Sequence, residues 1–185
     1  VYMAVLAVLL LSMVNSVCSG STYKTIDFSA GFNNYNLGGL YSGLDLGNTS
    51  LGGIPFYLAE DGGFWHSHYF SDPFAVNPHV LEISSLSISG ATALHTLINT
   101  YWGQPGPSSY AYIEVIGSAG AYFKKDFIGN VDMRDYNASG DWINSINGTT
   151  SINVFQNSAN YRLDKQIISL PTEFLTQEIT TIRFV

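Results

Sequence analysis

The chain has 185 residues, of which only 11% are charged, and its formal net charge is −7 with an isoelectric point near 4.8. An acidic chain with only seven lysines and arginines in total cannot neutralise many phosphates, so we expect no nucleic-acid partner. Glycine, asparagine, serine, threonine and tyrosine are abundant while lysine and glutamate are scarce. This composition is typical of β-rich surface proteins and not of helical enzymes.

The first twenty residues predict a secretory leader. An apolar run covers residues 3–14, and small residues follow it up to Gly20, as in the apolar core and cleavage region of a signal peptide. The run is too short for a stable membrane span, which takes about 20 apolar residues. No basic segment precedes it, so we expect the start of the protein to lie upstream. We therefore expect an extracellular protein, secreted or at the cell surface, with residues 1–20 either removed or retained as an apolar segment.

Residues 21–185 are long enough for a single domain that buries a core without cross-links. Cys18 is the only cysteine, so this domain can form no internal disulfide. Alternation of apolar and polar residues with a period of two dominates it and predicts strands. The expected strands are residues 25–28, 54–58, 80–89, 93–100, 110–116, 121–127, 151–155 and 179–185.

Local signals add detail to this pattern. Residues 54–58 should form an edge segment because Pro55 cannot donate a ladder hydrogen bond. We expect a bulge at Ser84 and Ser85, a loop over residues 103–107, and one helical turn over residues 171–176.

Short strands joined by Gly, Asn and Ser turns predict an all-β fold, an antiparallel β-sandwich of the jelly-roll or immunoglobulin-like type. The last expected strand ends the chain at Val185. That ending leaves either an exposed sheet edge, which can template pairing with another chain, or a position that a neighbouring subunit's strand completes.

Three asparagines match the N-glycosylation acceptor pattern Asn-x-Ser/Thr: Asn48, Asn137 and Asn147. All three fall in predicted turns of a secreted chain, where an acceptor must be accessible. About this many matches arise by chance in a chain so rich in asparagine, serine and threonine. We expect at least one of these positions to be glycosylated if the source is eukaryotic.

A pair of histidines raises the question of a metal site. His66 and His68 would point to one face of a strand, a known ligand arrangement, and His79 or His95 would have to complete it. The simpler interpretation is an aromatic-rich strand or loop whose histidines pack or lie at the surface. The sequence therefore predicts no metal at this segment.

Residues 130–137 offer clustered oxygen atoms that would suit calcium, although they lack the spacing of a dedicated calcium loop. The simpler interpretation is that Arg134 forms an ion pair with one of the carboxylates beside it and pins a turn. We expect no cofactor, with calcium as the alternative.

Four aromatic residues are candidates for stacking on sugar rings, namely Trp65, Tyr101, Trp102 and Trp142. Since 14% of the chain is aromatic, most such side chains must belong to the core. A carbohydrate-binding module is nevertheless an alternative function, and glycans are alternative partners.

Catalytic signatures are missing from the sequence, which contains no nucleophile elbow, zinc-binding helix or phosphate-binding loop. A glycosidase pair could be drawn from Glu60, Asp61, Glu82 or Glu114, but nothing singles out two of them. We predict that the protein is not an enzyme and keep a glycan-active hydrolase domain as a second alternative.

Three blocks carry a resemblance to known proteins: TLINTYWG at residues 96–103, GNVDMRDY at 129–136 and RLDKQ at 162–166. Together they resemble a group of uncharacterised secreted β-sandwich proteins over most of residues 54–185. Members of that group continue past the strand at residues 182–184 with a further strand. The chain also resembles the protomers of environmental extracellular helical fibrils that assemble by donor-strand exchange, which implies a structural protein without catalytic residues.

The leading hypothesis is a structural subunit of an extracellular filament or surface coat, whose partners are identical subunits. Its N-terminal arm, residues 21–32, would add a strand to a neighbour's sheet. Ile26 and Phe28 lie on one face of that donor strand, and residues 1–20 are the other candidate donor. A head-to-tail contact of this kind does not close and therefore generates fibres.

Overall fold

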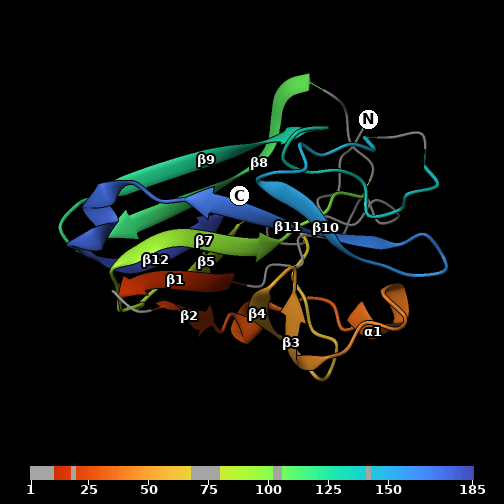
Figure 1. The fold of residues 1–185 in the computed structure, drawn as a ribbon, viewed down its shortest axis with the longest axis horizontal. Coiled ribbons are helices and arrows are strands. Elements are labelled where there is room, and N and C mark those ends of the chain that lie inside the picture. Colours follow the sequence, from red (N-terminus) through yellow and green to blue (C-terminus); the bar gives the residue numbers. More distant parts are fainter. Residues whose placement is uncertain (1–10, 18–19, 68–79, 102–105, 141–142) are drawn as a thin grey trace.

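The computed structural model describes residues 11–17, 20–67, 80–101, 106–140 and 143–185. These residues form an all-β structure of two antiparallel sheets and one separate hairpin (Figure 1). The strands are β1 (Leu11–Val17), β2 (Gly20–Ile26), β3 (Gly47–Leu51), β4 (Ile54–Leu58), β5 (Leu81–Ile83), β6 (Ile88–Ser89), β7 (Ala91–Leu97), β8 (Gly106–Gly117), β9 (Tyr122–Gly129), β10 (Ser151–Gln156), β11 (Arg162–Ser169) and β12 (Glu178–Phe184). Three helical turns join them: η1 (Ser29–Gly31), α1 (Leu37–Leu40) and η2 (Thr172–Leu175).

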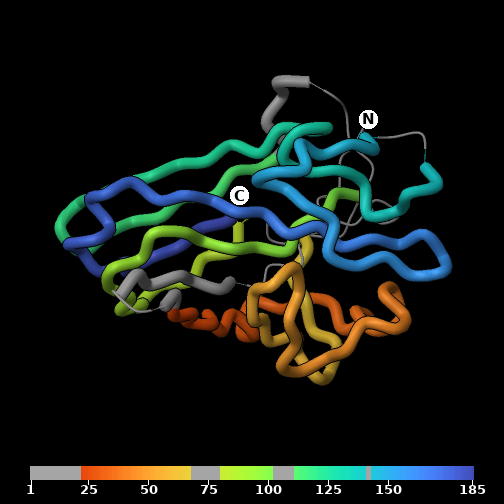
Figure 2. Tube along the Cα trace, viewed as in Figure 1, coloured from red at the N-terminus to blue at the C-terminus, as the bar shows by residue number. Residues whose placement is uncertain are grey.

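The first sheet has the order β10-β11-β7-β1-β2, and every neighbouring pair in it is antiparallel. The second sheet has the order β5-β12-β8-β9, with β6 also paired to β12. The hairpin β3–β4 contacts β1 and β2 without joining their sheet. Figure 2 shows the tube of β3 and β4 in orange, apart from the coloured strands of the two sheets. These pairings confirm the predicted antiparallel, sandwich-like all-β class.

The main core lies between the two sheets. Leu94 and Ile168 from the first sheet and Ile113, Val115 and Ile182 from the second are almost fully buried in one apolar cluster. Each such side chain contributes about 1.5–3 kcal/mol by leaving water. Successive side chains of a strand point to opposite faces, so the period-two pattern places these apolar residues on the faces that the two sheets turn toward each other.

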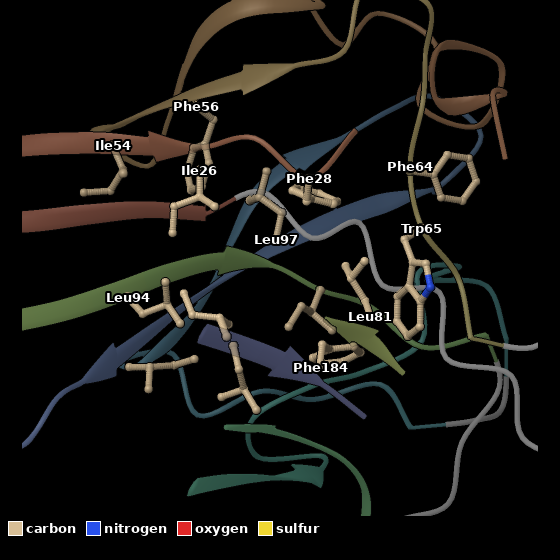
Figure 3. Packing of buried hydrophobic residues seen from close by; sticks show 14 of the residues in the cluster. Ile26, Phe28, Ile54, Phe56, Phe64, Trp65, Leu81, Leu94, Leu97 and Phe184 are labelled. Carbon is tan, nitrogen blue, oxygen red and sulfur yellow. The ribbon is translucent and has the colours of Figure 1, made fainter. Parts of the chain in front are cut away.

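The opposite face of the first sheet is also covered. Leu97 and Lys165 are paired neighbours on β7 and β11, and the Lys165 ammonium donates to the Gly52 carbonyl at the turn of the β3–β4 hairpin. Ile26 and Phe56 are buried in the same region (Figure 3). The hairpin therefore makes a third layer, which explains why β7 is buried on both faces near its end.

Several predicted elements are confirmed by the structure. The β8–β9 hairpin, β4, β10 and β12 lie where the alternation places them, and β4 is an edge strand that pairs only with β3 among the described strands. The predicted helical turn is the 3-10 turn η2.

Other predictions need correction. The strand predicted over residues 80–89 is interrupted, because Ser85 has a left-handed backbone (φ 59°) that separates β5 from β6. Gly106 and Pro107, the end of the predicted loop over residues 103–107, belong to β8, while residues 103–105 lie outside the described residues. Strands β3 and β11 were missed, since Gly47–Leu51 is mostly polar and Arg162–Ser169 carries charged and amide residues on both faces.

The N-terminal region holds an unexpected element. Residues 11–17, inside the predicted secretory leader, form β1, and β2 with η1 occupies the predicted arm of residues 21–32. Within the described part of the chain, none of the helices is long and apolar enough to cross a membrane.

Candidate functional site

Strand β1 occupies an interior position of the first sheet, between β7 and β2 (Figure 1). It runs antiparallel to both, with Ser12 opposite His95 of β7 and Thr25 of β2. Strand β2 has β1 as its only ladder partner among the described strands. The connection between β7 and β2 in the sheet therefore depends on a strand from the segment whose composition predicts a leader.

The predicted donor residues are anchored in the core of their own chain. Ile26 and Phe28 are 4% and 6% exposed, and the Phe28 ring meets Phe32 edge-on at 5.1 Å between ring centroids. Figure 3 shows both side chains beside Leu97. Their burial confirms that they share an apolar environment, while the donation of this strand to a second subunit stays a prediction.

A cavity of about 640 Å³ lies where the arm meets the β3–β4 hairpin. It is lined by residues 25–29, Phe32, Asn48, Tyr57 and residues 59–61. No lysine or arginine belongs to this lining, and Asp27, Glu60 and Asp61 do.

Two of the three cavity carboxylates also hold turns. Asp27 accepts a hydrogen bond from the Ser29 backbone N–H at 2.8 Å, and this bond lowers the pKa of Asp27. Asp61 accepts one from the Gly63 backbone N–H at 2.9 Å. The cavity walls are thus rich in acceptors. Spacing along the sequence does not reveal this cavity, because its lining comes from three separate segments.

The residues predicted to stack on sugars do not form a platform in the described structure. Trp65 is fully buried and packs edge-on against Phe184 at 5.3 Å (Figure 3), so it is not available to a sugar. Tyr101 is half-buried and stacks on Tyr136 at 5.4 Å between ring centroids. Trp102 and Trp142 lie outside the described residues.

The three glycosylation candidates differ in their surroundings. Asn48 is exposed but lies within strand β3, so its predicted turn location is wrong. Asn137 is half-buried in a loop, and its backbone forms an isolated antiparallel β-bridge with Tyr161. Asn147 is exposed in the loop before β10, as predicted.

Two of the four candidate metal ligands lie in the described part of the chain. His66 is buried, and its backbone N–H and C=O are both hydrogen-bonded by the Asn33 side chain. His95 lies on β7, while His68 and His79 fall outside the described residues. In the described ranges, no three His, Cys, Asp or Glu side chains gather as a metal site.

The oxygen-rich segment 130–137 uses its carboxylates internally. Asp132 accepts from the Lys125 ammonium at 2.8 Å, and Asp135 accepts from the Asn137 backbone N–H at 2.6 Å. The expected ion pair of Arg134 with an adjoining carboxylate is wrong, because Arg134 binds Asp164 on β11.

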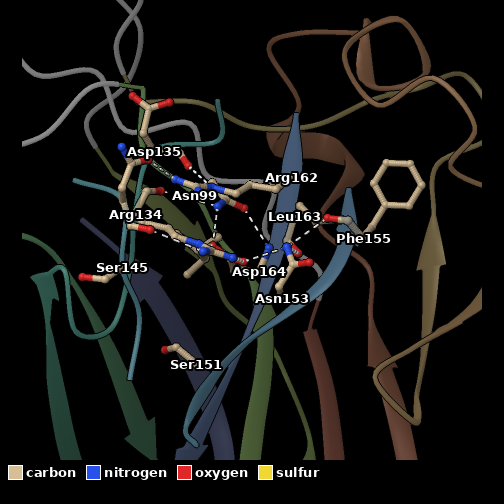
Figure 4. Close-up of polar contacts among 12 residues, drawn as sticks. Asn99, Arg134, Asp135, Ser145, Ser151, Asn153, Phe155, Arg162, Leu163 and Asp164 are labelled. Carbon is tan, nitrogen blue, oxygen red and sulfur yellow. Dashed lines mark hydrogen bonds and ion pairs between the residues drawn. The ribbon is translucent and has the colours of Figure 1, made fainter. Parts of the chain in front are cut away.

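Figure 4 shows the network around Asp164, whose side chain is fully buried. Arg134 donates from Nε and Nη2 to its two oxygens, both at 2.7 Å, and Asn99 and Asn153 add side-chain N–H bonds at 2.8 and 3.2 Å. Asn99, Arg134 and Asp164 come one each from the three sequence blocks at residues 96–103, 129–136 and 162–166. The blocks thus meet in space as one buried structural network.

All four carboxylates considered as candidates for a glycosidase pair lie in the described part of the chain. Glu82 and Glu114 flank Arg183 on neighbouring strands of the second sheet, with ion-pair distances of 2.9 and 3.3 Å. Glu60 and Asp61 are sequence neighbours at the cavity. Nothing in the described contacts distinguishes an acid from a base among these four.

No protein-family model, curated protein or solved structure matches the chain.

Proposed function

We propose that this chain is a structural subunit of an extracellular filament or surface coat that polymerises by strand addition. The observation that carries the proposal is the interior position of β1, a strand contributed by residues that predict a secretory leader. If processing removes residues 1–19, the first sheet loses an interior strand and not an edge strand.

Loss of β1 would have two consequences in the same molecule. The backbone of β7 would become an open edge, and β2 would lose its only ladder partner among the described strands. An open edge presents unpaired N–H and C=O groups that favour the addition of an extended segment. One copy would then carry both a free strand and a free acceptor.

The two free elements differ, so the contact between copies is head-to-tail. Such a contact leaves an unused acceptor at one end and an unused strand at the other, and it propagates as a fibre. The donor is the arm of residues 21–32, with Ile26 and Phe28 as its apolar contacts in the neighbouring subunit.

The proposal takes the protein to be non-enzymatic. In support, Glu82 and Glu114 share Arg183 as a counter-ion on the same sheet. Asp164, the most deeply buried carboxylate of the network, has its two oxygens occupied by Arg134 and two asparagines.

The test compares the full chain with a chain that begins at Gly20. We expect the shorter chain to form polymers in electron micrographs and sedimentation, whereas the full chain, which keeps β1, stays monomeric. A synthetic peptide of residues 20–32 in excess should cap the β7 edge and reduce polymer mass.

A matched peptide with Ile26→Asp and Phe28→Asp should leave the polymers unchanged, because its charged side chains cannot enter the apolar site. The proposal is wrong if the shorter chain remains monomeric, which would mean that β2 moves into the vacated position of its own sheet. It is also wrong if both peptides have the same effect.

A further inference from the structure

We propose that Asn48 is the glycan acceptor of this fold and that the first sugars of its glycan pack into the adjoining cavity over the ring of Tyr57. The cavity is then a carbohydrate site whose ligand is attached to the protein itself. This inference is independent of filament assembly.

The three acceptor asparagines are not equivalent in their hydrogen bonding. Asn147 Oδ1 accepts from the backbone N–H groups of residues 149, 150 and 151, and its Nδ2 donates to Thr150 Oγ1 at 2.8 Å. Asn137 is half-buried, and its Oδ1 accepts from the Ser139 N–H at 2.9 Å. Asn48 is exposed, and its side chain makes no hydrogen bond within the described part of the chain. Of the three asparagines, Asn48 can therefore carry a bulky substituent with the smallest loss of hydrogen bonds and packing.

Tyr57 is positioned to receive the first sugar. Asn48 and Tyr57 are directly opposite in the register of the β3–β4 hairpin. Opposed residues on one face have Cβ atoms about 4.5–5.5 Å apart. Tyr57 is 43% exposed and lines the cavity, so it is accessible to an attached group. A tyrosine ring supplies a large rigid surface for the C–H face of a pyranose.

The cavity has the size and polarity for this ligand. Its volume of about 640 Å³ falls within the roughly 300–1,000 Å³ of small-ligand sites. Asn48 and Tyr57 both line it, together with the aromatic rings of Phe28 and Phe32. The carboxylate of Glu60 has no partner in the described structure and can accept bonds from sugar hydroxyls. With no cation in its lining, the cavity suits a neutral polyhydroxyl group better than an anion.

The covalent step is the ordinary transfer of an oligosaccharide from a lipid-linked diphosphate donor. The Asn48 Nδ2 forms a bond to the anomeric carbon of the first sugar, and the bond from that carbon to the diphosphate oxygen breaks. The lipid diphosphate leaves with the electron pair, and one Nδ2 proton is released. No oxidation or reduction occurs, and the sequon Ser50 remains unmodified.

The experiment secretes the full chain from a eukaryotic host and measures occupancy of each acceptor by glycopeptide mass spectrometry. We expect Asn48 to be occupied. Trimming to the first sugar residues should keep most of the stabilisation, seen as a Tm about 2–4 °C above that of Ser50→Ala, which keeps Asn48 but removes the acceptor pattern.

Tyr57→Ala should abolish this Tm difference without changing occupancy. Tyr35→Ala, which removes another exposed tyrosine (60% exposed) away from the cavity lining, should retain it. The inference fails if Asn48 is unoccupied while Asn137 or Asn147 is modified. It also fails if Tyr57→Ala and Tyr35→Ala show the same Tm difference.

Discussion

At the scale of single residues, the buried carboxylate of Asp164 is stabilised by a partner far away in the sequence. Asp164 is fully buried on β11, and its partner Arg134 lies 30 residues earlier in a loop. The bidentate geometry and the two asparagine N–H bonds compensate the carboxylate for lost hydration. Removing the charge should leave the Arg134 guanidinium, 14% exposed, without its counter-ion.

We predict that Asp164→Asn lowers the free energy of unfolding by about 3–5 kcal/mol, since breaking one side of a buried pair leaves an uncompensated charge. Asp126→Asn is the matched control, because the Lys124–Asp126 pair is exposed, and it should cost less than about 1 kcal/mol. Urea unfolding monitored by circular dichroism measures both. Equal effects of the two substitutions would contradict the role given to the network.

His95 is a second residue whose environment has a measurable consequence. His95 is 4% exposed, and its Nδ1 has no hydrogen-bond partner within the described structure. Burial, with a smaller contribution from the nearby Lys165 charge, lowers the pKa of His95 from 6.5 to about 4. The folded protein therefore holds this imidazole in its neutral form at neutral pH.

The unfolded chain takes up a proton at His95 as the pH falls through 6.5, whereas the folded protein does so only near pH 4. The unfolded state binds more protons in this window, so stability falls as the pH is lowered, by up to about 3 kcal/mol in total. We predict that His95→Leu removes this component of the slope between pH 6.5 and 4. Denaturation at several pH values tests it, and an unchanged slope in the variant would refute it.

At the scale of elements, the β3–β4 hairpin is joined to the first sheet at its turn. Gly52 and Gly53 form that turn with φ of +58° and +77°. A Cβ on Gly52 would lie 2.7 Å from Val154 Cγ1 and 2.9 Å from Lys165 Nζ, whereas a Cβ on Gly53 would meet nothing within 4 Å. Since Lys165 is 2% exposed and bonded to the Gly52 carbonyl, it has little room to move.

We therefore predict that Gly53→Ala costs about 1–2 kcal/mol from backbone strain alone. Gly52→Ala should cost about 1–3 kcal/mol more, because it adds overpacking against the sheet. Thermal unfolding of the two variants measures the difference. If they are equally stable, the turn is not pressed against β10 and β11.

The positions of strands can be predicted from the local alternation of residues where one face is apolar and the other polar, as in the β8–β9 hairpin. The pattern fails where an element is buried on both faces or carries polar residues inside. Arg162–Ser169 illustrates this, because Asp164, Lys165 and Gln166 are all buried there through contacts with distant segments.

At the scale of the whole molecule, β1 holds an interior position in the first sheet, and our proposal connects that position to leader processing and assembly. An apolar run is typical both of a secretory leader and of a strand buried within a sheet, so composition cannot distinguish the two. The comparison of the full chain with the chain from Gly20 is therefore a test of the whole molecule. Its outcome depends on whether the position beside β7 is filled by the same chain or by another.

By itself, the sequence determined the all-β class, most strand positions and the acidic character of the chain, because alternation and composition are local properties. Only the tertiary structure decided which segments meet. It paired Arg134 with Asp164 and not with its neighbours, buried Trp65 and assembled the cavity beside Asn48 and Tyr57. Strand order and long-range packing bring these residues together, and neither is encoded in the spacing of residues along one segment.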